Sequence, residues 1–199
     1  METINDRIQI SSGKDANGAL TGEICNFVHQ VSGKGVNDTK RLYSMIMELM
    51  TNTKQHAYLD KGGIMGGNWY IFAEGLENSS VRFVFLDTGI GIPATINKKF
   101  SEKIKDLMRI FGAPFDESKY ISSALRGEFR SETRQQNRGK GLPGIYEDSC
   151  SGLISGLVII SGSGECRILP DCTIEENQLE TNFNGTLYIW NFHEQKGVG

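Results

Sequence analysis

The chain has 199 residues, enough for one domain with room for a small additional lobe. Its 21 lysines and arginines against 24 aspartates and glutamates leave a net charge of −3, so composition gives no general attraction to nucleic acid or to an anionic membrane. A hydrophobic content of 38% supports a folded core, and no apolar run reaches the roughly 18 residues that a membrane helix needs. The polar, acidic N-terminus argues against a secretory signal, so we expect a cytoplasmic protein.

The first third of the chain predicts one strand and two amphipathic helices. Residues 7–10 alternate in polarity, as a strand does, and apolar residues at helical spacing predict a helix over 19–30. A longer helix is expected over 40–57, with Asn37-Asp38-Thr39 as its N-cap cluster and its apolar side chains along one stripe. The glycine-rich residues 62–67 cannot hold a helix and predict a loop.

The middle of the chain predicts a hairpin followed by helices. Strands are expected at 69–73 and 81–86, and the short turn between them predicts that they pair antiparallel. Helical periodicity follows over 95–111, with a short helix expected around 118–125. A second glycine-rich segment, residues 138–144, leads into a further helix.

The last third predicts more antiparallel pairing. Residues 153–161 and 165–169 are expected to form another hairpin, and 186–192 the last strand. The fold class predicted is an α/β (α+β) two-layer sandwich, in which a mixed, mostly antiparallel sheet carries helices on one face, within a single domain over residues 1–199. The four cysteines form no CxxC pair, so we expect neither a disulfide framework nor a structural zinc site.

One side of the predicted long helix carries residues suited to a metal-bound substrate. Glu48, Asn52 and His56 are spaced four residues apart and project from one side, roughly opposite much of the apolar stripe. The Asn side-chain oxygen suits a hard cation such as Mg²⁺, and a carboxylate one turn away could orient and deprotonate an attacking hydroxyl or water. A solvated helix face explains the same spacing and, taken alone, is the simpler interpretation.

The segment Asp87-Thr88-Gly89-Ile90-Gly91-Ile92-Pro93 directly follows a predicted strand. Two glycines around one hydrophobic residue let the backbone approach a flat ligand closely. An Asp at a strand end can accept a hydrogen bond from an exocyclic amine such as that of adenine. A tight turn with a solvated Asp is the alternative, and the motif alone does not separate the two.

The glycine-rich segment 138–144 has the features of an anion site. Free N–H groups at a helix start attract anions, Pro143 fits a first helical turn, and Arg138 and Lys140 add positive charge. Arginines recur every fourth residue over 126–138, which is equally compatible with a basic lid over phosphates and with a solvated loop. The Walker A pattern is absent, because no Ser or Thr follows the lysine.

Taken in order, these segments resemble the motifs of the GHKL ATPases, the family of DNA gyrase, Hsp90-type chaperones, MutL-type repair proteins and the ATP-binding domain of histidine kinases. Residues 48–57 are similar to the N box, 87–93 to the G1 box and 138–144 to the G2 box, and Asn184-Gly185-Thr186 is similar to the terminal G-T segment. The four segments occur in family order over about residues 38–192. The resemblance implies a Bergerat-type ATP-binding fold with ATP and Mg²⁺ as cofactors.

The resemblance also implies a role for each matching position. Asn52 would chelate Mg²⁺, Asp87 would accept a hydrogen bond from the adenine amino group, and Glu48 stands where the family has its catalytic carboxylate. The other cofactor-binding positions implied are the glycines of the adenine pocket, the phosphate-contacting residues of the lid and a threonine that reaches adenine: Gly89, Gly91, Arg138, Gly139, Lys140, Gly141 and Thr186.

The activity that the resemblance implies is hydrolysis of ATP, or transfer of its γ-phosphoryl group to a partner protein in the manner of a histidine kinase or an anti-sigma serine kinase. The expected partners are ATP and ADP, with a protein partner or a flanking domain and without nucleic acid. His29 lacks the acidic neighbour and the long dimerisation helices of a phosphoaccepting histidine, so we interpret it as structural. A non-catalytic module, whose lid closes on ATP to control partner binding, is the alternative.

Overall fold

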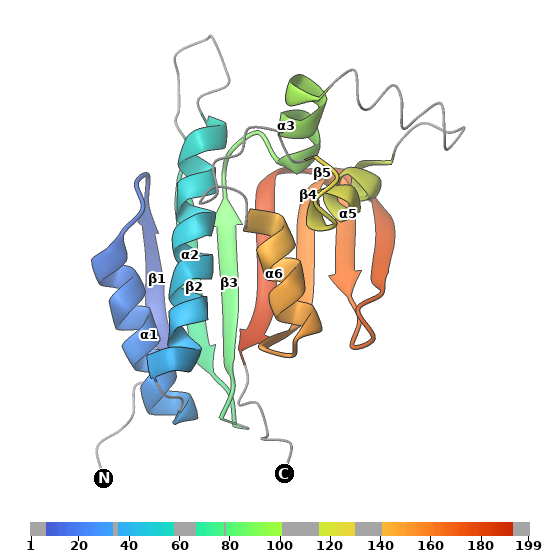
Figure 1. The fold of residues 1–199 in the computed structure, drawn as a ribbon. Coiled ribbons are helices and arrows are strands. Elements are labelled where there is room, and N and C mark those ends of the chain that lie inside the picture. The colour runs from blue at the N-terminus through green and yellow to red at the C-terminus, as the bar shows by residue number, and fades with distance from the viewer. Residues whose placement is uncertain are drawn as a thin grey trace.

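The computed structural model describes residues 7–33, 36–57, 67–77, 79–100, 116–129 and 141–192. The strands in these ranges are β1 (Arg7–Gly13), β2 (Trp69–Gly75), β3 (Val81–Asp87), β4 (Ile154–Ile168) and β5 (Ile174–Phe192). The helices in these ranges are α1 (Gly18–Ser32), α2 (Val36–Ala57), α3 (Ile92–Lys99), α5 (Glu117–Leu125) and α6 (Gly141–Cys150). Figure 1 shows the strands as one sheet, with α1, α2 and α6 against the same face.

The sheet has the strand order β1-β2-β3-β5-β4. The predicted hairpin is confirmed, with Trp69 opposite Asp87 at one end of β2–β3 and Gly75 opposite Val81 at the other. The predicted two-layer arrangement of a sheet with helices on one face is confirmed as well. The expectation of a mixed sheet is corrected, because every neighbouring pair among the described strands is antiparallel.

Alternate strand residues separate the two faces of the sheet. On β3, Phe83 and Phe85 are buried toward the helices, whereas Val84 and Leu86, which alternate with them, are partly exposed. The Phe83 ring stacks on Trp190 of β5 with the ring centres 5.1 Å apart. Each buried side chain of this size stabilises the fold by about 1.5–3 kcal/mol, so this face supplies much of the core.

The hairpin predicted at 153–161 and 165–169 is wrong, because residues 154–168 form the single strand β4. Gly162 has a φ of +62°, and the register with β5 shifts on both sides of it. The glycine therefore makes a bulge at which the strand bends. The actual turn comes after Ile168, where the amide of Leu169 donates to the carbonyl of Thr173 at 2.9 Å.

The last strand is longer than predicted. Residues 186–192 are the end of β5, which begins at Ile174 and pairs its polar first half with the second half of β4. Backbone pairing holds this half in place, and few of its side chains are buried. Sequence patterns based on alternating apolar side chains do not detect such a strand.

Helix boundaries also differ from the prediction. The helix α2 begins at Val36, so Asn37-Asp38-Thr39 lies inside its first turn and is not its N-cap. The helix α3 ends at Lys99, and the rest of the helix predicted over 95–111 lies outside the described residues, apart from Phe100, which caps α3. All but the last residue of the predicted loop at 62–67 is outside them too. No helix in the described part of the chain combines the length and the apolar character needed to cross a membrane.

Candidate functional site

The helices α2 and α6 lie side by side and run in opposite directions (Figure 1). At one end, Arg41 of α2 forms an ion pair with Asp148 of α6, and its Nε lies 2.9 Å from Asp148 Oδ1. Two helical turns away from this ion pair, toward the C-terminus of α2 and the N-terminus of α6, the start of α6 lies against Glu48 and Asn52. A Cβ atom built on Gly141 would lie 3.1 Å from Asn52 Nδ2 and 3.4 Å from Glu48 Oε1. Residues predicted from two separate motifs, Glu48 and Asn52 from one and Gly141 from the other, therefore lie together.

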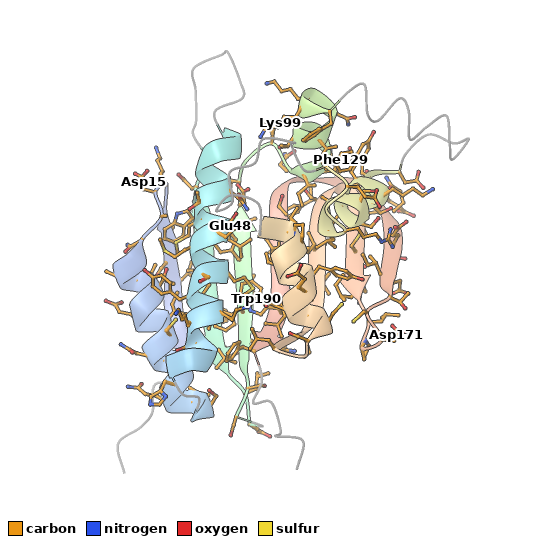
Figure 2. The ribbon with its side chains drawn as sticks, in the orientation of Figure 1. Asp15, Glu48, Lys99, Phe129, Asp171 and Trp190 are labelled. Carbon is orange, nitrogen blue, oxygen red and sulfur yellow. The ribbon has the colours of Figure 1, made fainter. Side chains whose placement is uncertain are left out.

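This contact changes the interpretation of the α2 surface. Glu48 and Asn52 are half-buried and face α6, so a solvated helix face does not describe them. Figure 2 shows Glu48 within the helix layer. The prediction placed Glu48 and Asn52 on the side of α2 opposite much of the apolar stripe. It was incomplete, because α6 covers that side of α2. The backbone of His56 belongs to α2, but its side chain lies outside the described residues.

The start of α6 has the properties of an anion site. The first four N–H groups of an α-helix have no partner within the helix, and the helix dipole adds partial positive charge there. Pro143 lies in this first turn, as predicted. Arg138, Gly139 and Lys140 precede the helix directly, but they lie outside the described residues, so their phosphate contacts stay predictions.

A second polar cluster forms where three strands meet. Asp87 of β3 lies opposite Thr186 of β5, which in turn lies opposite Ser161 of β4, and all three side chains are buried. Asp87 Oδ1 accepts a hydrogen bond from the amide of Gly89 at 2.7 Å. Burial raises the pKa of Asp87 above its usual value, and the bond from Gly89 opposes part of that rise.

Ser161 organises this cluster, and the sequence analysis did not identify it. Its hydroxyl accepts from the amide of Ile92 at 2.9 Å and donates to the carbonyl of Gly185 at 2.8 Å. Its oxygen also lies 3.0 Å from Thr186 Oγ1. Because the single Ser161 proton is directed to Gly185, Thr186 acts as the donor between the two hydroxyls and keeps its own lone pairs as acceptors. A polar residue that ends an apolar run just before a glycine was the available signal.

The glycines of the Asp87–Pro93 segment are explained by packing within the chain. Gly91 has a φ of +84°, and a Cβ atom there would lie 2.9 Å from Ser161 Oγ and 3.1 Å from the carbonyl oxygen of Gly185. A Cβ atom on Gly89 would lie 3.0 Å from Asp87 Oδ1. These glycines allow the loop to pack on β4 and β5, which places Asp87 firmly at the end of its strand.

The first cluster lies between α2 and α6, and the second lies on the sheet. The strand register places Asp87 and Thr186 on the helix-covered face, in the same alternation as Phe85 and Tyr188. In Figure 1, β3 ends toward the same edge of the sheet at which α6 begins. No three His, Cys, Asp or Glu side chains of the described ranges are arranged to hold a metal ion. Asn52 could supply one oxygen ligand to Mg²⁺, which commonly takes its other ligands from phosphates and water.

No protein-family model and no curated protein matches the chain. Among solved structures, it is similar to the histidine kinase domain of the blue-light activated histidine kinase EL346 from Erythrobacter litoralis. The TM-score is 0.37 and the sequence identity 16%. The match covers 88% of this chain and 59% of that one, so this chain spans less than two thirds of its neighbour. A similarity at this level says nothing about activity.

Proposed function

We propose that the chain binds Mg²⁺-ATP between the helix layer and the sheet, and hydrolyses it or transfers its γ-phosphoryl group to a partner protein. The observation that carries the proposal is the contact of Gly141 with Glu48 and Asn52. It brings a helix N-terminus, a carboxylate and an amide side chain, whose oxygen can ligate a cation, to one point. These are the groups needed to hold phosphates, to orient an attacking group and to ligate Mg²⁺.

The cluster around Asp87 suits the adenine base. Its Oδ1 accepts from Gly89, which leaves Oδ2 as an acceptor for the exocyclic amine. Thr186 supplies a second acceptor beside it, because its own proton is directed to Ser161. In a buried setting, two acceptors favour a base that carries an amino group and disfavour one that offers a carbonyl oxygen there.

Catalysis at such a site rests on positioning and on charge. The N–H groups at the start of α6 would hold phosphate oxygens, and bound Mg²⁺ would neutralise their charge. Glu48 would orient the attacking water or hydroxyl and accept its proton. The ion pair between Arg41 and Asp148 would fix the position of α6 along the axis of α2, two turns away from the reacting groups.

Thermal unfolding with and without Mg²⁺-ATP tests the proposal. Ligand at a hundred times its dissociation constant stabilises the folded state by about 2.7 kcal/mol, which is about 5–10 °C in melting temperature for a chain of this size. Asp87→Asn should abolish that shift. Glu48→Gln should keep the shift and lower turnover at least about a hundredfold, whereas Glu23→Gln on the exposed surface of α1 serves as the matched control.

The outcomes separate the possible functions. No shift with any adenine nucleotide would overturn the proposal. A shift without ADP formation or phosphoryl transfer, in single-turnover assays with labelled ATP, would instead indicate the non-catalytic module. Undiminished turnover in Glu48→Gln would remove the catalytic role of that carboxylate.

A further inference from the structure

Two of the four cysteines meet at the end of α6 that is remote from Gly141. Cys150 is the last residue of α6 and is exposed, and Cys172 lies in the turn between β4 and β5. The thiol of Cys172 is close enough to that of Cys150 to contribute to the raised pKa of Cys150. Figure 2 labels Asp171 in this turn. The pair therefore joins a helix to a hairpin that follows it in the sequence.

A backbone contact fixes this approach independently. Tyr146 precedes Cys150 by one helical turn and so lies on the same side of α6. Its hydroxyl donates to the carbonyl oxygen of Cys172 at 2.7 Å. The helix face that carries Cys150 is thus held against the residue that carries the second thiol.

The other two cysteines have different surroundings. Cys166 is fully buried in β4, and its thiol lies 3.2 Å from the carbonyl oxygen of Ser118. Cys25 lies on α1, with its thiol 3.5 Å from the carbonyl oxygen of Thr39. Both contacts are to backbone oxygens, so these cysteines provide internal controls.

We propose that Cys150 and Cys172 form a reversible intramolecular disulfide when a peroxide is present, and that this bond locks the end of α6 to the β4–β5 hairpin. One thiol attacks hydrogen peroxide, breaks the O–O bond and becomes a sulfenic acid, with release of one water. The second thiol attacks the sulfenic sulfur, the S–S bond forms and a second water leaves. The two cysteines are oxidised, and the peroxide is reduced to the two waters.

The surroundings of the Cys150 thiol slow its reaction with an oxidant. Partial desolvation of the thiol, together with the neighbouring Cys172 thiol, raises the pKa of Cys150 to about 11, so its thiolate is scarce near neutral pH. Because the thiolate is the form that attacks peroxide, disulfide formation should be slow near neutral pH and faster as the pH rises. The inference does not depend on nucleotide binding, because thiol chemistry and unfolding report it directly.

The test is quantitative labelling of free thiols in the intact chain. After treatment with hydrogen peroxide, the protein is unfolded, labelled with a maleimide and analysed by intact mass and peptide mapping. We expect two of the four cysteines to escape labelling, a linked peptide that contains Cys150 and Cys172, and full labelling again after dithiothreitol. Cys150→Ser and Cys172→Ser should keep every remaining thiol free, while Cys25→Ser should behave like the wild type.

Unfolding gives the second readout. A bond that closes a loop of this length should raise the melting temperature of the oxidised wild type by about 5–10 °C, and Cys150→Ser should show no rise. Full labelling after peroxide, a linked peptide that includes Cys25 or Cys166, or sulfonic acid at Cys150 without a disulfide would overturn the inference. A disulfide without any rise in melting temperature would overturn the locking of α6.

Discussion

Replacement of Gly141 by alanine should separate ligand binding from folding. The backbone of Gly141 does not have a positive φ, so alanine brings no backbone strain. The added methyl group would lie 3.1 Å from Asn52 Nδ2, which is closer than ordinary van der Waals contact. The Asn52 side chain must therefore move by a few tenths of an ångström, away from the position in which it would hold Mg²⁺.

The two effects on stability nearly cancel. Alanine in place of glycine stabilises a helix interior by up to about 1 kcal/mol, and less in the first turn. A side chain forced away from its preferred rotamer costs about 0.5–1.5 kcal/mol. The free energy of unfolding should change by about 1 kcal/mol at most, which corresponds to about 2–4 °C in melting temperature. The affinity for Mg²⁺-ATP should fall about tenfold or more, or by at least about 1.4 kcal/mol.

Calorimetric titration with Mg²⁺-ATP and thermal unfolding without ligand measure the two quantities separately. Gly22→Ala on α1 is the matched control, because a methyl group at this position would have no atom within 4 Å. It should raise stability by about 1 kcal/mol and leave the affinity unchanged. An unchanged affinity in Gly141→Ala would show that the contact between α2 and α6 is not at the phosphate site.

Two further substitutions test the interactions that hold the clusters. Asp87→Asn should raise the melting temperature without ligand at neutral pH, because it removes a carboxylate whose pKa burial has raised. That penalty is present above the raised pKa and is relieved as the pH falls toward 3.8, so the difference from the wild type should shrink from pH 7 to pH 4 in thermal unfolding. A constant difference would contradict this reasoning. Arg41→Ala should destabilise the fold by about 2 kcal/mol in urea unfolding, because it removes the cation paired with the buried Asp148 carboxylate. The double variant with Asp148→Asn should recover part of that loss, and no recovery would show that the ion pair is not the cause.

Much of the fold could be predicted from local patterns. The apolar stripe of α2 and the alternation in β2 and β3 are repeated over enough residues to fix the type of element. The behaviour of Gly162 could not be predicted in this way. A glycine in a strand can make a turn or a bulge, and here pairing with a polar stretch of β5 decides for the bulge.

The candidate site also combines features that local sequence patterns predict with contacts that they do not predict. The sequence by itself determined which side chains are candidates for chemistry, since a carboxylate and an amide one turn apart, or an Asp at the end of a strand, are visible in the order of residues. Only the tertiary structure decided that Gly141 meets Glu48 and Asn52, and that Ser161 connects Thr186 to the amide of Ile92. Such contacts join elements far apart in the chain. They depend on how whole helices and strands pack, and no local pattern records that.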